Sequence, residues 1–158
     1  FFEEALPPSL VAKIRATKER ISLQAHCAPP SPNAPNREKI LAHNFPLMIK
    51  AGVKLVLATD TGIHPGHTFG SGEHVELARW VQLGLPPAEA IVAATKTPAE
   101  LMGLADLGTL TPNKKASFVV LDANPLDNIR NTRTIADVYL DGVKFDREAI
   151  RARWRTLR

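Results

Sequence analysis

VKLVLATDTGIHPGH, residues 53–67, joins a run of aliphatic residues to a glycine-rich loop that carries two histidines. The run lies between Gly52 and the turn residues Asp60-Thr61-Gly62, and it is almost uninterrupted in branched and aliphatic side chains. Such a run is typical of a strand that is buried on both faces, as strands are in parallel sheets. We therefore predict a buried parallel strand that ends on Asp60.

Helical patterns precede this strand. Residues 9–19 have helical periodicity, and the proline-rich residues 29–36 are interpreted as an inserted loop. The segment REKILAHNFPLMIKAG is also helical in pattern, but Pro46 cannot donate a backbone hydrogen bond inside a helix. We therefore predict a break at Asn44, which would cap a second helix that ends with Gly52 at its C′ position.

Three more helices are predicted after the glycine-rich loop. EHVELARWVQLG ends on Gly84 and is expected to pack on the sheet through a broad apolar stripe, formed by Val75, Leu77, Ala78, Val81 and Leu83. LPPAEAIVAAT begins with proline in its first turn, where a missing N–H costs least. TPAELMG predicts a short helix with a capping box, in which Thr97 is the cap, Pro98 the first residue, Glu100 the residue that reaches back and Gly103 the terminator.

The sequence pattern changes near residue 104. Residues 104–146 contain short alternating strands separated by turn residues, and Asp141-Gly142 is expected at the tip of a hairpin. We predict an α/β part at 1–103, a small β part at 104–146 and a basic amphipathic helix at 147–158. That helix is expected to dock through its apolar side, formed by Ile150, Trp154 and Leu157.

Length and charge limit the possible architectures. A chain of 158 residues, of which 44% are apolar, has enough material for one domain, or for one domain with a small appendage. A complete eight-stranded α/β barrel needs about 250 residues, so the chain can hold only part of one. The net charge of +4 comes from basic residues that are scattered among acidic ones, except in the C-terminal helix. Nucleic-acid binding by that helix is therefore a minor alternative.

The expected location is the cytoplasm. Cys27 is the single cysteine, so the chain has no intramolecular disulfide framework that would require an oxidising compartment. The sequence does not open with a signal peptide, and Lys50 and Lys54 interrupt the longest apolar stretch before it reaches the ~20 residues that span a bilayer. We therefore expect no membrane association.

Several short motifs, taken together and in order, resemble a known family. They are ATDTG at residues 58–62, the segment that runs from HVELARWVQLG to FVVLDANPLDNI at residues 74–129, and IADVYLDGVKFD at residues 135–146. Across residues 36–147 the chain resembles the C-terminal part of the amidohydrolase superfamily, especially its imidazolonepropionase-like and Xaa-Pro dipeptidase-like members. Two positions depart from the family pattern, which has Gly where Asn113 stands and Asp where Ser117 stands.

The resemblance implies a fold and a reaction. In the family, a metal-dependent (β/α)8 barrel is followed by a small β-sandwich domain built from both ends of the chain. The chain would then be the last part of the barrel, including its eighth strand, with the C-terminal strands of the sandwich. The complete enzyme is expected to hydrolyse a C–N bond in a cyclic amide or a dipeptide-like substrate, with metal-activated water.

Asp60 is the residue that the resemblance marks as catalytic, because it corresponds to the aspartate that ends the eighth strand. The carboxyl ends of barrel strands meet at the active-site mouth, so a carboxylate there can face substrate. Asp60 is therefore expected to be a metal ligand and to move a proton from water to the leaving amine. The alternative is that Asp60 only caps the following turn, since Asp-Thr-Gly is common in turns.

Nearby polar residues are expected to support Asp60. The family often has histidine at the position of His74, which we predict to orient substrate. His64 and His67 are candidates for substrate contact or loop gating, with solvated loop residues as the alternative. Thr59 and Thr61 are predicted to hydrogen-bond the Asp60 carboxylate and orient it.

The ligand set of the family is incomplete in this sequence. The family also binds metal through a His-x-His pair on its first strand and through histidines on later strands, and the sequence contains no His-x-His. The resemblance implies one or two divalent ions, zinc above all, whose other ligands must come from a missing N-terminal barrel segment or another chain. We expect the isolated chain to be inactive and to form homo-oligomers. The alternative is a non-catalytic scaffold or interaction module that keeps a remnant of the fold.

Overall fold

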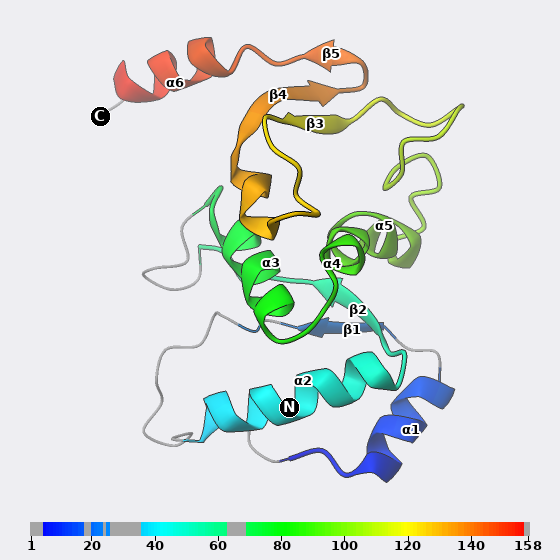
Figure 1. The fold of residues 1–158 in the computed structure, drawn as a ribbon. Helices are drawn as coiled ribbons and strands as arrows, with labels where there is room; N and C mark the ends of the chain where they lie inside the picture. Colours follow the sequence, from blue (N-terminus) through cyan, green and yellow to red (C-terminus); the bar gives the residue numbers. More distant parts are fainter. Residues whose placement is uncertain (1–4, 18–19, 24, 26–35, 63–68, 157–158) are drawn as a thin grey trace.

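The computed structural model describes residues 5–17, 20–23, 25, 36–62 and 69–156 as a mixed α/β chain (Figure 1). Its elements in chain order are α1 (Pro8–Ala16), β1 (Arg20–Leu23), α2 (Arg37–Lys50), β2 (Lys54–Leu57), α3 (Gly72–Gln82), α4 (Pro87–Ala94), α5 (Lys96–Leu101), β3 (Phe118–Leu121), η1 (Ile129–Arg133), β4 (Ile135–Leu140), β5 (Val143–Lys144) and α6 (Arg147–Thr156). In Figure 1 the strands β1 and β2 lie side by side, with α1 and α2 on one side and α3, α4 and α5 on the other.

The predicted buried strand is β2, and it pairs in parallel with β1. Leu55 and Val56 point to opposite faces because side chains alternate along a strand, and they are only 6% and 7% exposed. Both faces of β2 are therefore covered, as the aliphatic run predicts. Strand β1 was not predicted, because its four residues give too short a pattern to separate from the helix before it.

Helix α2 runs through Pro46 without a break, so the predicted interruption at Asn44 is wrong. Asn44 is fully buried, and its side-chain oxygen accepts a hydrogen bond of 2.8 Å from the backbone N–H of Leu6. The amide is thus used by a distant segment and does not cap a helix. Gly52 has a φ of 69° directly beyond the C-cap Ala51, which confirms it as the residue that ends the helix.

One hydrophobic core joins the helices to the parallel strands. Phe45 of α2 and Trp80 of α3 are both fully buried, and their ring centroids lie 5.5 Å apart. The buried face of α3 differs from the predicted stripe, because Glu76 and Trp80 are fully buried while Val75 and Val81 are only partly buried. A tertiary hydrogen-bond partner for Glu76 explains this difference and is described below.

The predicted helices after α3 are present, but one cap is misplaced. Helix α4 has proline in its first turn, as predicted. Helix α5 begins at Lys96, so Thr97 lies inside it, is 8% exposed and does not act as the cap. Thr95 precedes α5 and donates its hydroxyl to the Ile91 carbonyl at 2.7 Å. Gly103 has a φ of 71° just beyond the helix, as its predicted role as terminator requires.

The C-terminal region forms the antiparallel sheet β3-β4-β5. The β4–β5 hairpin turns at Asp141 and Gly142, with φ of 50° and 81°, and these positive values confirm the predicted Asp-Gly turn. Asn113 has a φ of 67°, the left-handed conformation for which the family uses glycine. The region joins the main core through Ile129 of η1, which is 5% exposed. The division of the chain into domains near residue 104 stays a prediction.

The helix predicted at the C-terminus is α6, but it does not dock as expected. Ile150 and Trp154 are 42% and 67% exposed, and no residue of α6 is buried by the described part of the chain. Figure 1 shows α6 extending away from the helices around β1 and β2. Across the described ranges, no helix is both long enough and apolar enough to span a bilayer.

Candidate active site

The carboxyl ends of β1 and β2 lie at the same edge of the parallel sheet. Leu23 and Leu57 are the last partners in the register, and Ala25 and Thr59 come two residues later in the sequence after their respective strands. Asp60 follows Thr59 with a φ of 45°, a conformation that aspartate tolerates better than most residues. Asp60 is exposed to solvent in this chain. In a parallel α/β fold, this edge is where substrates bind.

The hydroxyls on either side of Asp60 face helix α3. Thr59 Oγ1 and Thr61 Oγ1 lie 2.6 Å apart, and each lies 3.4 Å from Glu73 Oε1 in the first turn of α3. Gly72 permits this approach, because a Cβ at that position would lie 2.7 Å from Thr61 Oγ1. Among the described residues no hydrogen bond joins either hydroxyl to Asp60, and both hydroxyls contact Glu73 instead.

His74 lies at the opening of α3, and its ring is fixed by the C-terminal region. Its Nδ1 atom lies 3.0 Å from Thr132 Oγ1, and the Thr132 hydroxyl donates its one proton to the Ile129 carbonyl at 2.9 Å. His74 Nδ1 must therefore carry the proton in the bond to Thr132, which leaves Nε2 as the acceptor in the neutral ring.

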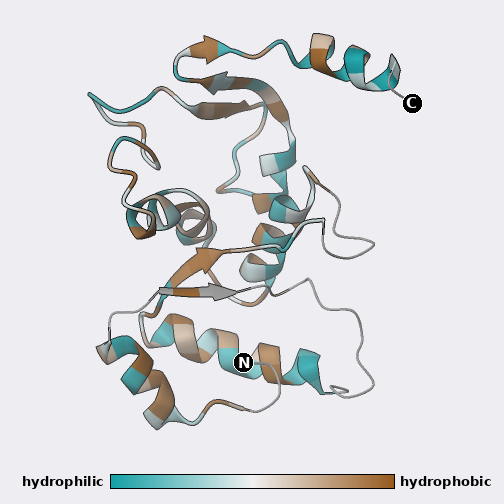
Figure 2. Cartoon of the chain, turned by 180° about the vertical axis from the view of Figure 1, so that it is seen from behind, coloured by the Kyte–Doolittle hydropathy of each residue, from teal (hydrophilic) through white to brown (hydrophobic). Residues whose placement is uncertain are grey.

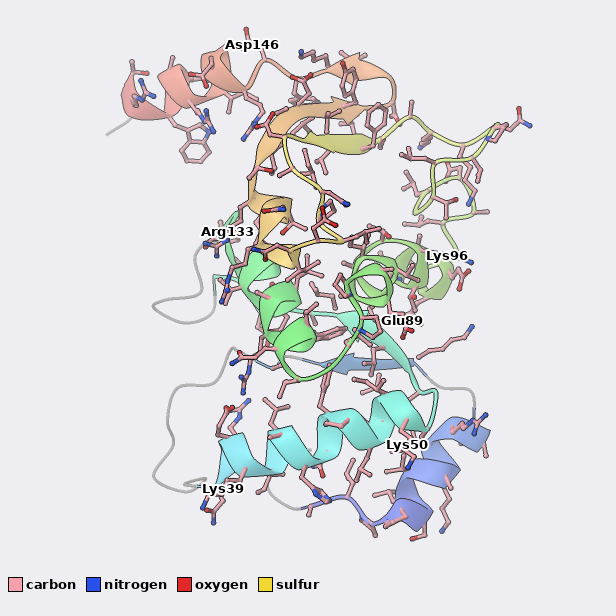
Figure 3. All side chains as sticks on the ribbon, in the orientation of Figure 1. Lys39, Lys50, Glu89, Lys96, Arg133 and Asp146 are labelled. Atoms are coloured by element: carbon pink, nitrogen blue, oxygen red, sulfur yellow. The ribbon has the colours of Figure 1, made fainter. Side chains whose placement is uncertain are left out.

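The charge of His74 is set by burial and by two neighbours. Burial and the positive charge of Arg133 lower the pKa of His74 below its usual 6.5, while Glu73 acts in the opposite direction. Figure 3 shows Arg133 at the end of η1, close to the first turn of α3. The imidazole is therefore mainly neutral near neutral pH, with Nε2 able to accept a proton or a hydrogen bond.

Glu76 is a further polar residue at this edge, and its role was not predicted from the sequence. It is fully buried, and its Oε1 accepts hydrogen bonds from Trp80 Nε1 at 2.5 Å and from the backbone N–H of Ala25. The sequence pattern that could have predicted this role is a glutamate within the apolar stripe of α3, four residues before a tryptophan. A buried carboxylate needs hydrogen-bond donors, and a tryptophan at that spacing can supply one.

The described residues do not assemble a metal centre by themselves. His64 and His67 lie outside the described residues, and no group of three or more His, Cys, Asp or Glu side chains comes together within them. A catalytic zinc ion takes about three protein ligands, so the single carboxylate of Asp60 does not fit one without further donors.

A cavity of about 440 Å³ lies at the other end of β2. It is lined by Val53 just before β2, by Lys54 and Leu55 in the first half of the strand, and by residues of α4 and α5. Figure 3 shows two residues that line it, Glu89 and Lys96, on these helices. The cavity is therefore distant along the strand from Asp60, and it is not part of the candidate active site.

The arrangement of these elements is that of (β/α)8-barrel hydrolases. Phenylurea hydrolase B superposes with a TM-score of 0.80 and 32% identity over 93% of this chain and 37% of its own. Molinate hydrolase superposes with a TM-score of 0.77 and 27% identity over 91% of this chain and 36% of its own. The fold therefore identifies this chain as part of an amidohydrolase barrel together with the β region that follows the barrel.

The family follows directly from the sequence match. The model of the amidohydrolase family matches residues 6–144, and the chain belongs to this family. It is 36% identical over 103 residues to the imidazolonepropionase of Flavobacterium johnsoniae, and 32% identical over 117 residues to that of Deinococcus radiodurans. These matches cover 60% and 72% of this chain but only 24% and 27% of the relatives, so the chain spans about a quarter of their length.

Proposed function

We propose that this chain is the C-terminal portion of a hydrolase that cleaves a C–N bond in a cyclic amide or a dipeptide-like substrate. The observation that carries the proposal is Asp60, which lies three residues after the end of the buried parallel strand β2 in a chain whose residues 6–144 match the amidohydrolase family. The similarity to imidazolonepropionases and to phenylurea hydrolase B supports hydrolysis of a C–N bond.

Asp60 is the proposed proton carrier of the reaction. Its carboxylate would accept a proton from the attacking water molecule and deliver that proton to the departing amine. Asp60 is exposed at the edge of a sheet that has only two strands among the described residues, so its carboxylate is accessible to water and substrate. His74, with Nε2 available as an acceptor, is proposed to orient substrate beside it.

Metal dependence is part of the proposal. A divalent ion such as zinc would supply the activation of water at this edge, with Asp60 as one ligand and the other ligands outside the described residues. Three or more donors are required, so the isolated chain is proposed to be inactive until the rest of the barrel is present.

The test is an Asp60→Asn substitution in the complete gene product. Hydrolysis of hydantoins, N-acyl amino acids and Xaa-Pro dipeptides is measured with bound metal determined in parallel, before and after a chelator. We expect chelator-sensitive turnover in the wild type and a loss of at least about 100-fold in Asp60→Asn. Asp127→Asn, in an exposed turn, is the matched control and should keep full turnover.

Two results would count against the proposal. Full turnover in Asp60→Asn would remove the proton-carrier role. A complete gene product that binds no metal and hydrolyses none of these substrates would favour the non-catalytic scaffold.

A further inference from the structure

Helix α3 contacts the ends of both parallel strands through two glutamates. Glu73 and Glu76 are three residues apart, so they lie on the same side of the helix. Glu73 faces Thr59 after β2, and Glu76 accepts the N–H of Ala25 after β1. Because β1 and β2 are adjacent and parallel, one face of α3 contacts residues that follow the ends of two neighbouring strands.

Glu76 carries the stronger of these two connections. Glu73 is exposed and its contacts to the threonines are 3.4 Å long, whereas Glu76 has no exposed surface. A buried carboxylate is stable only when donors compensate for the lost water, and Ala25 N and Trp80 Nε1 are two such donors. The bond to Ala25 links residues 51 positions apart, so the chain gains it only in the folded state.

We propose that Glu76 is a positioning residue that fixes Ala25, two residues after β1, against the strand edge on which Asp60 lies. The inference rests on the proposed hydrolase function, because only an active site at this edge makes the position of Ala25 matter for turnover. Trp80 holds the Glu76 oxygen from the helix side, and the oxygen in turn holds Ala25. Glu76 acts through the backbone of Ala25 and does not itself need to contact substrate.

Amide hydrogen exchange tests the positioning without any assay of activity. In the wild-type chain, the Ala25 amide should exchange at least about tenfold more slowly than its unprotected rate, because its N–H is bonded to a buried acceptor. Glu76→Gln keeps an oxygen acceptor and should keep most of this protection, whereas Glu76→Ala should lose it. An unprotected Ala25 amide in the wild type would overturn the proposal whether or not any variant folds.

Kinetics of the complete gene product test the consequence for the reaction. Glu76→Ala should lower kcat by roughly tenfold or more and change KM by less than about threefold, since misplaced groups affect the reacting geometry most. The comparison is made at a temperature at which circular dichroism gives the same folded fraction as the wild type. Glu76→Gln should restore most of kcat, and Glu89→Ala on the exposed side of α4 is the control for a lost surface carboxylate.

The outcomes separate this inference from the proposed function. An unchanged kcat in folded Glu76→Ala, or a loss in Glu76→Gln as large as in Glu76→Ala, would overturn the role of the Glu76 oxygen as acceptor. A wild-type protein that hydrolyses none of the substrates would instead overturn the proposed function, and the exchange rates would still decide whether Glu76 holds Ala25.

Discussion

Gly72 stands where helix α3 meets the end of β2, and its lack of a side chain allows the close contact. The nearest atom to a Cβ at this position would be Thr61 Oγ1 at 2.7 Å, a separation that real Cβ atoms rarely have. Glu73 follows directly on the helix, so the position of Gly72 controls how its carboxylate reaches the strand edge. A single missing side chain therefore contributes to the geometry of the candidate site.

Gly72→Ala is expected to destabilise the fold by about 1–3 kcal/mol, the usual cost of inserting an extra carbon into a packed site. The measurement is the denaturant midpoint of the variant and of a double-mutant cycle with Thr61. Thr61→Ala in the Gly72→Ala background should recover part of the loss by removing Oγ1, whereas Thr61→Val should not. Equal stability of Gly72→Ala and wild type would contradict the contact.

His74 gives the stability of the chain a pH dependence of known sign. Its pKa is lowered in the folded state, mainly by burial and then by Arg133, so the unfolded chain binds a proton more readily. The free energy of unfolding should therefore be highest above pH 6.5, the usual pKa of histidine in the unfolded chain. It should decrease as the pH falls toward the lower pKa of His74 in the folded state. We expect Tm to fall between about pH 7.5 and about pH 5.5 by more in the wild type than in His74→Asn.

The matched control for this experiment is His43→Asn on the exposed side of α2. It should have the same pH dependence as the wild type, because the effect depends on burial and on the charge of Arg133. A His74→Asn variant with an unchanged pH dependence would show that other groups dominate.

At the scale of elements, α2 demonstrates that tertiary contacts can override a local rule. Proline has no N–H to donate to the carbonyl four residues earlier, so a helix interior normally excludes it. Here α2 continues through Pro46 because the neighbouring Phe45 and Met48 are fully buried in the core and Asn44 holds the N–H of Leu6. Packing of the turn thus offsets the missing hydrogen bond.

Pro46→Ala should stabilise the chain, because alanine restores the missing donor and suits a helix interior. The expected gain is about 1–3 kcal/mol, reduced by the greater freedom of the unfolded chain. Urea denaturation followed by circular dichroism measures it. Asn44→Ala is expected to have the opposite effect, since it leaves the Leu6 N–H without this acceptor. A Pro46→Ala variant less stable than the wild type would mean that the proline ring itself supports the helix.

At the scale of the whole molecule, the chain leaves apolar surface uncovered. In the described part of the chain, β1 and β2 form a sheet of only two strands, and parallel sheets are normally covered and extended on both sides. Figure 2 shows hydrophobic residues along β3 and β5, where Val119 and Val143 are 51% and 66% exposed. Uncovered strands and apolar faces of this kind favour association.

The isolated chain is therefore expected to self-associate at roughly micromolar concentrations. Size-exclusion chromatography with light scattering over a range of concentrations measures this. Val119→Lys on β3 should weaken the association, whereas Val92→Lys, at a similarly exposed position on α4, should not. A monomer at all concentrations would contradict the prediction and would also weaken the inference that the chain needs the rest of a barrel.

The sequence alone determined those features that depend on neighbouring residues. The aliphatic run of β2, the proline at the start of α4 and the Asp141-Gly142 turn were all predictable, because strand burial, helix starts and left-handed turns follow from local residue types. The position of Asp60 in the turn after β2 was predictable for the same reason. The catalytic role of Asp60 stays a prediction, because it depends on the resemblance to the family.

Only the tertiary structure decided the partners of buried polar groups. Glu76 became a core residue because Ala25, from a distant strand end, donates to it, and His74 obtained its tautomer from Thr132 in the C-terminal region. Such partners lie 51 and 58 positions away in the sequence. Hydrophobic periodicity cannot reveal them, because a buried polar side chain is stabilised by a specific donor or acceptor that the fold brings to it.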